Sequence, residues 1–315
     1  MELSVFDLHC DTADAIYDGN ASLLSNSFHI SLERMSAFNT YTQVMAVYIP
    51  HKLSDEEGYE YWKRVMNYLN TEIRANTGIV ESVRNGSELL SCTKRGRIAA
   101  IYAIEDSRII GKNLDRLQEF YDSGVRFMTL TWSGSTIIGG SHNTSDGITE
   151  YGRAAVQKMH EIGIVPDISH ASEALAEDVC AISAERSKPL VATHSNSYSV
   201  WGHTRNLRDR HFNVIKELGG LVGISFCPAH LTDGKHTRVA LSDVIPHVEY
   251  YLSLGGENTV ALGGDFDGTD LPADLDTCSD LYKLANELLK LNYPQSLVDK
   301  IFYLNARNFA INNLR

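Results

Sequence analysis

The residues best suited to chemistry in this 315-residue chain lie directly after short apolar runs of the sequence. Three are histidines and three are carboxylic acids, and together they follow five different runs. They are His9, Asp11, Glu105, His170, His194 and Asp265. Imidazole and carboxylate groups are the ligands that zinc and similar divalent ions select in proteins. The sequence therefore predicts a metal centre, provided that the fold brings the five runs to one place.

The first of these groups is the tripeptide His9-Cys10-Asp11. Residues two apart on a strand point to the same face, so His9 and Asp11 can reach one ion while Cys10 points the opposite way. Such a tripeptide is common by chance and is a weak signal alone. The whole set fits two ions that share one carboxylate, and Glu105 is the best-placed residue to bridge them.

Eight short runs rich in Val, Ile, Phe and Tyr resemble strands, and each is followed by a helical pattern. They begin near Ser4, Gln43, Ile98, Val125, Ile164, Leu190, Leu221 and Val260. Near-continuous apolar strands are typical of a parallel sheet covered by helices on both faces. Eight such units, with no GxGxxG after the first strand, favour a closed (β/α)8 TIM barrel over an open sheet. In that barrel the active site lies at the carboxyl ends of the strands, where the six residues would meet.

The rest of the chain fits one barrel domain over residues 1–315. The longest insertion, residues 50–97, is expected to form two helices, and residues 294–315 a closing helical segment. Amphipathic patterns predict further helices over residues 55–77, 113–123, 150–162, 171–184, 209–218, 242–254 and 280–291. Gly124, Gly163 and Gly219 stand where helices should end before the next strand.

The composition is that of an ordinary globular protein, with 43% hydrophobic and 22% charged residues, which excludes disorder. A net charge of −12 argues against nucleic acid or an anionic membrane as a partner. No run approaches the roughly 18 apolar residues of a membrane span, and the start lacks the pattern of a secretory signal. Five scattered cysteines without a CxxC spacing suggest a reducing cytoplasm.

Six motifs give the chain a family resemblance. DLHCDT (7–12), AIED (103–106), PDISH (166–170), THSN (193–196), RNLRD (205–209) and GGDFDG (263–268) follow in this order. In order, position and spacing they resemble the membrane (renal) dipeptidase family of zinc metallopeptidases over essentially the whole chain. GITEYG (147–152) looks like the bacterial branch of that family.

The resemblance implies a binuclear zinc centre and a metallo-dipeptidase activity. His9 and Asp11 match the ligands of one zinc ion, His170 and His194 those of the second, and Glu105 the bridging carboxylate. Two Zn²⁺ per chain would activate a bridging hydroxide for attack on the peptide bond of a small dipeptide, which could carry a D-residue at its C-terminal position.

Two more positions match substrate-binding residues of the family. Arg205 matches the residue that pairs with the free carboxylate of the substrate, as a guanidinium fork does well. Asp265 matches the acid that contacts the substrate amine and passes a proton to the leaving group. The resemblance also leaves a homo-oligomer open.

The match departs from the family at the fourth strand. Where the vertebrate members have a histidine that stabilises the tetrahedral intermediate, this chain has Trp132. Indole donates one hydrogen bond but neither accepts nor titrates, so another donor is needed. We expect His142, in the loop that follows, to replace it and both residues to face the substrate.

Two alternatives stay open at this point. One is a related amide or lactone hydrolase with the same two metals and a different substrate. The other is a barrel that binds metal or ligand without catalysis, with Trp132 blocking the pocket. His203 could lie near the pocket mouth, and Cys227 is expected to be a packing residue. The remaining histidines are expected to be surface or structural residues: His29, His51, His160, His211, His230, His236 and His247.

Overall fold

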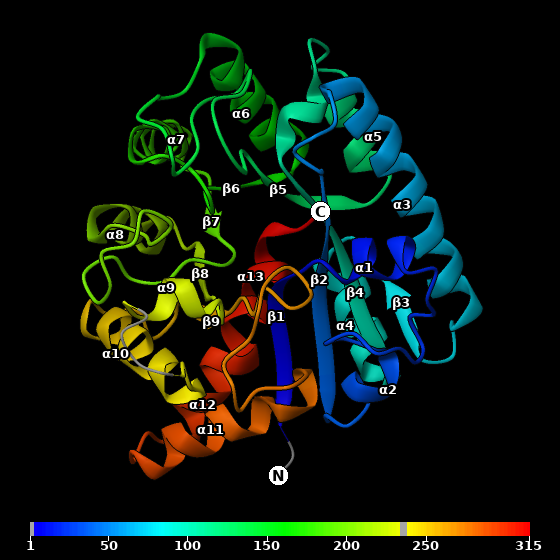
Figure 1. Ribbon diagram of the computed structural model, residues 1–315, viewed down its shortest axis with the longest axis vertical. Helices are drawn as coiled ribbons and strands as arrows, with labels where there is room; N and C mark the ends of the chain where they lie inside the picture. Colours follow the sequence, from blue (N-terminus) through cyan, green and yellow to red (C-terminus); the bar gives the residue numbers. More distant parts are fainter. Residues whose placement is uncertain (1–2, 234–237) are drawn as a thin grey trace.

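Eight parallel strands form a closed ring in the computed structural model, which describes residues 3–233 and 238–315. They are β1 (Ser4–Cys10), β2 (Thr40–Tyr48), β4 (Ile98–Glu105), β5 (Val125–Thr129), β6 (Val165–Asp167), β7 (Val191–Ala192), β8 (Leu221–Ile224) and β9 (Val260–Leu262). The ring closes because β1 pairs in parallel with both β2 and β9. Figure 1 shows the helices around it. The predicted (β/α)8 barrel is confirmed, and each of its strands corresponds to one of the eight predicted runs.

One strand was not predicted. β3 (Val80–Ser82) pairs with Ile98–Ala100, the first residues of β4, whereas β5 pairs with β4 only from Tyr102 onward. It therefore covers a stretch of β4 edge that the barrel leaves open. A strand of three residues is too short to show a recognisable hydrophobic pattern in the sequence, which is why β3 was not predicted. The insertion otherwise consists of the two expected helices, α3 (Asp55–Ala75) and α4 (Gly86–Lys94).

The helices outside the ring agree with the predicted segments. They include α5 (Arg116–Asp122), α6 (Glu150–Ile162), α7 (Glu173–Arg186), α8 (Asp209–Glu217), α10 (Ile245–Ser253) and α11 (Leu281–Lys290). Three short helices were missed: α1 (Thr12–Asp18), α2 (Leu32–Met35) and α9 (Pro228–Leu231). Gly163 ends α6 with a φ of 99°, a left-handed conformation that suits glycine. None of the described helices is long and apolar enough to cross a membrane.

Two apolar layers hold the barrel together. Along β4, Ala99, Ile101 and Ala103 belong to the cluster that fills the barrel, while the residues between them pack outward against the helices. This alternation is the period-two pattern of a strand. Glu105 follows in the same register as Ala103, so the pleat of β4 turns its side chain inward at the carboxyl end.

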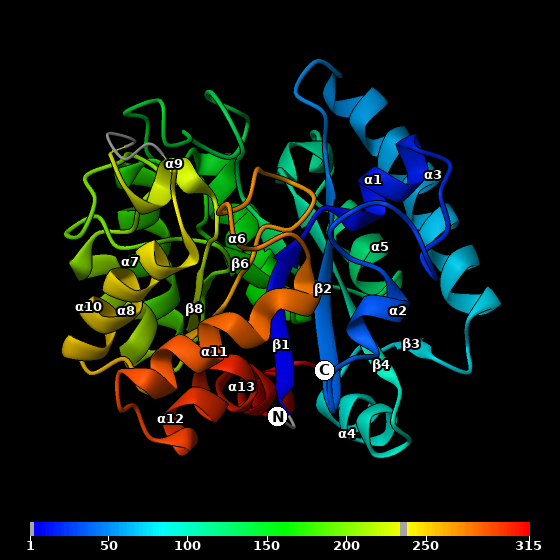
Figure 2. The same ribbon diagram turned by 60° about the horizontal axis from the view of Figure 1, so that its bottom comes forward.

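The amino-terminal end of the barrel is closed by the end of the described chain. α12 (Gln295–Asp299), a π-helical turn (Lys300–Leu304) and α13 (Asn305–Asn313) confirm the predicted closing segment. Phe309 of α13 stacks on Phe127 of β5 with ring centres 6.2 Å apart, and both belong to the inner cluster. Figure 2 shows α13 beneath the strands, with the loops that follow the strands at the opposite end.

This closure makes a prediction for stability. Replacing Phe309 with alanine leaves a cavity between α13 and the barrel and should lower the free energy of unfolding by about 3–5 kcal/mol. Chemical denaturation measures this, with Leu90→Ala on exposed α4 surface as the control. A loss below about 1 kcal/mol would show that α13 is not part of the core.

Candidate metal centre and substrate pocket

The six predicted residues converge at the carboxyl ends of five strands. His9 ends up there because β1 contains a bulge. Asp7 of β1 pairs with Gln43 of β2, and Cys10 pairs with Met45. Between these two pairs β1 takes three residue steps whereas β2 takes two. Phe6 and Leu8 face the barrel interior, so strict alternation would have turned His9 outward. A bulge re-aims the side chain, and here it brings His9 inward.

Two of the histidines face one another across Glu105. His170 Nε2 lies 2.9 Å from His194 Nε2 and 2.9 Å from Glu105 Oε1, and His194 Nε2 lies 3.6 Å from the same oxygen. Burial lowers the pKa of both histidines well below the ordinary value. Neutral imidazole is the form that binds a metal ion.

The outer nitrogen of each ring fixes its tautomer. His170 Nδ1 lies 3.2 Å from the carbonyl oxygen of Trp132, which can only accept, so this nitrogen carries the proton. His194 Nδ1 lies 2.9 Å from the Thr193 hydroxyl, which itself donates to the buried carboxylate of Asp167. Both arrangements leave the Nε2 lone pairs facing Glu105, which is the outer-shell pattern of metal-binding histidines.

A second group lies on the other side of Glu105. His9 Nε2 is 3.5 Å from Glu105 Oε2, 3.7 Å from Asp11 Oδ2 and 4.0 Å from Asp265 Oδ1. Among the described residues, His9 Nε2 and Asp11 Oδ1 are buried without a hydrogen-bond partner. Glu105 thus turns one oxygen to each group.

Electrostatics favour a cation at this second group. Burial and the neighbouring carboxylates raise the pKa of Asp11 and Asp265, the latter to about 8. The pKa of His9 is also raised, because Glu105 and Asp11 outweigh the opposing effect of its burial. Clustered buried carboxylates are costly unless positive charge compensates them. The donor set therefore fits metal ions at both groups.

The backbone supports this arrangement at a cost. His170 and Asp265 adopt left-handed conformations with φ of 66° and 58°. Residues other than glycine rarely do so, and such strained positions are concentrated at functional sites.

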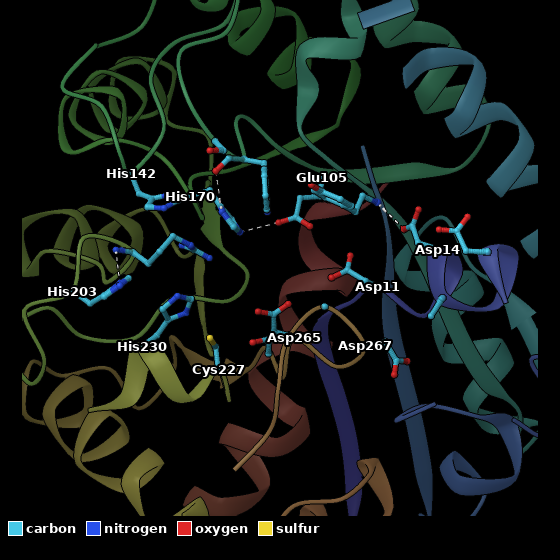
Figure 3. Close-up of a pocket in the computed structure, with 18 residues that line it drawn as sticks. Asp11, Asp14, Glu105, His142, His170, His203, Cys227, His230, Asp265 and Asp267 are labelled. Atoms are coloured by element: carbon cyan, nitrogen blue, oxygen red, sulfur yellow. Dashed lines mark hydrogen bonds and ion pairs between the residues drawn. The ribbon is translucent and has the colours of Figure 1, made fainter. Parts of the chain in front are cut away.

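The centre opens into a pocket of about 620 Å³. Figure 3 shows His203 and His230 on one side, Asp11 and Asp14 on the other, and Glu105 and Asp265 between them. Trp132, His142 and Arg205, expected at the substrate, all line this pocket. His203 lines it as suggested, whereas Cys227, expected as packing, faces it too.

Arg205 is the most unusual residue of the pocket. It is 6% exposed, and none of its three side-chain nitrogens has a hydrogen-bond partner among the described residues. Burial lowers its pKa, although nearby Asp265 and Glu105 oppose this. A buried guanidinium without a partner is costly, so the pocket is suited to an anion that supplies the missing hydrogen bonds.

Trp132 and His142 reach the site in different ways. The Trp132 ring packs edge-to-face on Tyr48 at 5.0 Å. The His142 ring lies 5.8 Å from that of His170, and its buried Nδ1 has no partner among the described residues. Burial, with Arg205 and His203 nearby, lowers its pKa to about 4, so His142 is neutral at pH 7 and keeps one N–H to donate.

Sequence reasoning missed several pocket residues. His230 was taken as surface or structural, and that was wrong, because it lines the pocket from α9. Asp14 and Tyr48 also line it. The position of Asp14 one turn after Asp11 could have been found, since the chain after a barrel strand runs along the rim. His236 lies outside the described residues.

Comparisons with known proteins agree with this geometry. Residues 1–309 match the family described as "Membrane dipeptidase (Peptidase family M19)". "Dipeptidase verJ" of Clonostachys rogersoniana is 30% identical over 293 residues, which cover 88% of this chain and 74% of that protein. An uncharacterised protein from the pqqA 5' region of Klebsiella pneumoniae is 31% identical over 243 residues, covering 74% and 89%.

Solved structures show the same similarity. A metallopeptidase from Rhodobacter sphaeroides, liganded with a phosphinate mimic of the dipeptide L-Ala-D-Ala, is 26% identical and superposes over both full chains with a TM-score of 0.92. The structure of a metallopeptidase named dipeptidase AC gives 27% identity and 0.93, over 100% of this chain and 99% of that one.

The chain therefore belongs to the membrane dipeptidase family, peptidase family M19. This confirms the resemblance read from the motifs and the expected enzyme class, a metal-dependent hydrolase of the dipeptidase type.

The hydrogen bonds behind His194 make a prediction. Thr193→Val removes the hydroxyl that orients His194 and should weaken the binding of an added divalent metal ion, with Zn²⁺ as the probe, by about 10–100-fold. Thr129→Val is the matched control, because Thr129 also donates to Asp167 but touches no histidine. Competition with a fluorescent chelator measures both affinities. Equal losses in the two variants would show that the Thr193–His194 contact does not matter.

Proposed function

We propose that this protein is a dipeptidase with two zinc ions, which hydrolyses small dipeptides that include ones with a D-residue at the C-terminal position. The observation that carries the proposal is that the Arg205 side chain, buried and without a hydrogen-bond partner in the described part of the chain, lines the same pocket as two ligand groups divided by Glu105. One ion would be held by His9 and Asp11, the other by His170 and His194, with Glu105 between them. When bound, such a pair lowers the pKa of a water molecule and polarises a carbonyl group.

Arg205 binds the free C-terminal carboxylate of the substrate. A guanidinium fork matches a carboxylate at two points, and this pair is strong where water is excluded. Because Arg205 and the ligand groups line the same pocket of about 620 Å³, only a short chain fits between them. This is the reason for a dipeptide rather than a longer peptide.

Asp265 handles the proton. Its Oδ1 lies 4.0 Å from His9 Nε2, beside the ligand groups, where the carboxylate can take up a proton and deliver it to the leaving amine nitrogen. His142 donates its N–H to the oxygen that becomes negative during attack. Trp132, at the position of the family histidine, forms part of the pocket wall, and its carbonyl holds His170.

Substrate stereochemistry and location belong to the same proposal. The phosphinate mimic of L-Ala-D-Ala bound by the Rhodobacter sphaeroides relative supports a D-residue in second position. A reducing cytoplasm is supported by the five cysteines, all of which are buried and unpaired. A homo-oligomer stays a prediction.

Metal content and activity test the proposal together. Elemental analysis of purified protein should find two zinc ions per chain, and a chelator should abolish hydrolysis, with recovery on adding zinc. The assay is a dipeptide panel with L- and D-residues in second position. Zinc-loaded protein that hydrolyses no dipeptide, but cleaves simple amides or lactones, would identify a related hydrolase instead.

Arg205→Met separates a substrate-binding role from a structural one. Losing a buried charge pair with the substrate should lower kcat/KM for dipeptides by about 30-fold or more, since such a loss costs about 2–5 kcal/mol. The free energy of unfolding should stay the same or rise, because the variant no longer buries an unpaired charge. Arg208→Gln, at an exposed ion pair with Glu173, is the control. A large loss of stability would contradict this role.

A further inference from the structure

The pocket wall formed by α1 carries two acidic side chains outside the proposed ligand set. Burial and the nearby Asp11 raise the pKa of Asp14, so a positive charge beside it would favour its ionised form. α1 begins directly after Asp11 and brings Asp14 and Asp18 to the pocket. Four residues apart, they lie on one helix face about 6 Å from each other. Among residues 3–233 and 238–315, their hydrogen-bond partners are a backbone N–H and a tyrosine hydroxyl rather than a basic side chain.

Asp14 is held in place while its carboxylate still faces the pocket. Its Oδ2 accepts from the backbone N–H of Tyr48 at 2.8 Å, and its Oδ1 accepts from the Tyr61 hydroxyl at 2.9 Å. The residue is 8% exposed. Each oxygen keeps a further lone pair, so Asp14 can accept from a ligand without giving up its protein contacts. Asp18 is exposed and lies nearer the pocket rim.

Aromatic rings line the pocket together with these carboxylates. Tyr48 and Trp132 pack edge-to-face, and His51 lies 5.8 Å from Trp132. Both Tyr48 and Trp132 line the pocket. Aromatic faces attract cations and also cover the aliphatic stem of a lysine or arginine side chain. Carboxylates beside aromatic rings form the environment in which a positively charged side chain binds well.

The direction of the substrate follows from Arg205. The Arg205 backbone N–H donates to His203 Nδ1 at 3.2 Å, so the side chain of Arg205 enters the pocket, which both residues line, from the His203 side. Figure 3 shows that side opposite Asp14, with Glu105 and Asp265 between. A dipeptide with its carboxylate at Arg205 and its peptide bond beside Glu105 therefore turns its N-terminal residue toward α1.

We propose that Asp14 and Asp18, together with Tyr48 and Trp132, form a subsite for a positively charged side chain on the N-terminal residue of the substrate. The enzyme then favours dipeptides that begin with lysine or arginine over those that begin with alanine. This inference rests on the proposed function, because the proposed pairing of Arg205 with the substrate carboxylate sets the direction of the substrate.

The test compares lysyl and alanyl dipeptides that share the same second residue. Wild-type enzyme should show a kcat/KM at least about tenfold higher for the lysyl dipeptide, because a partly buried charge pair is formed. Asp14→Asn keeps the shape, since an amide accepts from Tyr48 N–H and donates to the Tyr61 oxygen. It should remove most of that preference and change the alanyl substrate by less than about threefold.

Asp18→Asn and a control complete the series. Asp18→Asn should lower the lysyl preference by only about threefold, because exposed ion pairs contribute little. Glu217→Gln removes the same charge at an exposed site on α8 and should leave both substrates unchanged. Binding of the phosphinate analogues of the two dipeptides, followed by calorimetry, gives the same comparison without turnover.

Each outcome decides the inference. Equal losses for both substrates in Asp14→Asn would show that Asp14 serves the α-ammonium, which every dipeptide has, or the fold, and would overturn it. Equal hydrolysis of both dipeptides by the wild type would overturn it while leaving the proposed dipeptidase intact. If neither dipeptide is cleaved, the proposed function fails, and tighter binding of the lysyl analogue in the wild type but not in Asp14→Asn would still support the subsite.

Discussion

The site depends on one shared carboxylate. Glu105 turns Oε1 toward His170 and His194 and Oε2 toward His9, so a single side chain divides the centre into two groups. Asp11 and Asp265 crowd the second group, where burial and mutual repulsion make their ionised forms costly. Positive charge at the centre relieves that repulsion. The same constraint explains why the residues arrive from five strands, since no single element could hold so many acids close together.

The barrel meets this constraint through indirect contacts. Asp167 does not face the centre, but it fixes Thr193, and Thr193 fixes the tautomer of His194. Asp7 plays a comparable part next to His9. Its carboxylate accepts hydrogen bonds from the backbone N–H groups of His9 and Gly264 and so links the two segments. These buried acids belong to the scaffold. The acidic residues at this rim therefore have at least two roles: some face the centre, and others, such as Asp7 and Asp167, hold the backbone and the ligand side chains in place.

The sequence predicts the barrel well because its strands are near-continuous apolar runs. It also predicts which residues meet at the rim, because the carboxyl ends of parallel strands meet there. His9 shows the limit of pattern reasoning. Alternation from Phe6 and Leu8 would place it outside. The bulge that turns it inward begins at Asp7, whose carboxylate accepts from the Gly264 backbone N–H, far away in the chain. His230 and Asp14 were missed for a related reason, because α9 and α1 are too short to show a periodic pattern.

The few contacts that join the first and last strands of the ring lie beside the candidate metal ligands. β1 and β9 share a single register pair, Asp7 with Leu262. Beyond it the two ends are joined by the Asp11 N–H to Phe266 oxygen and Asp265 N–H to His9 oxygen contacts. The segments that carry His9, Asp11 and Asp265 are thus the ones that fasten the ring. One ligand atom each from His9, Asp11 and Asp265 lie within 4.8 Å of one another, so an ion that bound all three would link the two ends of the ring and stabilise the barrel against unfolding.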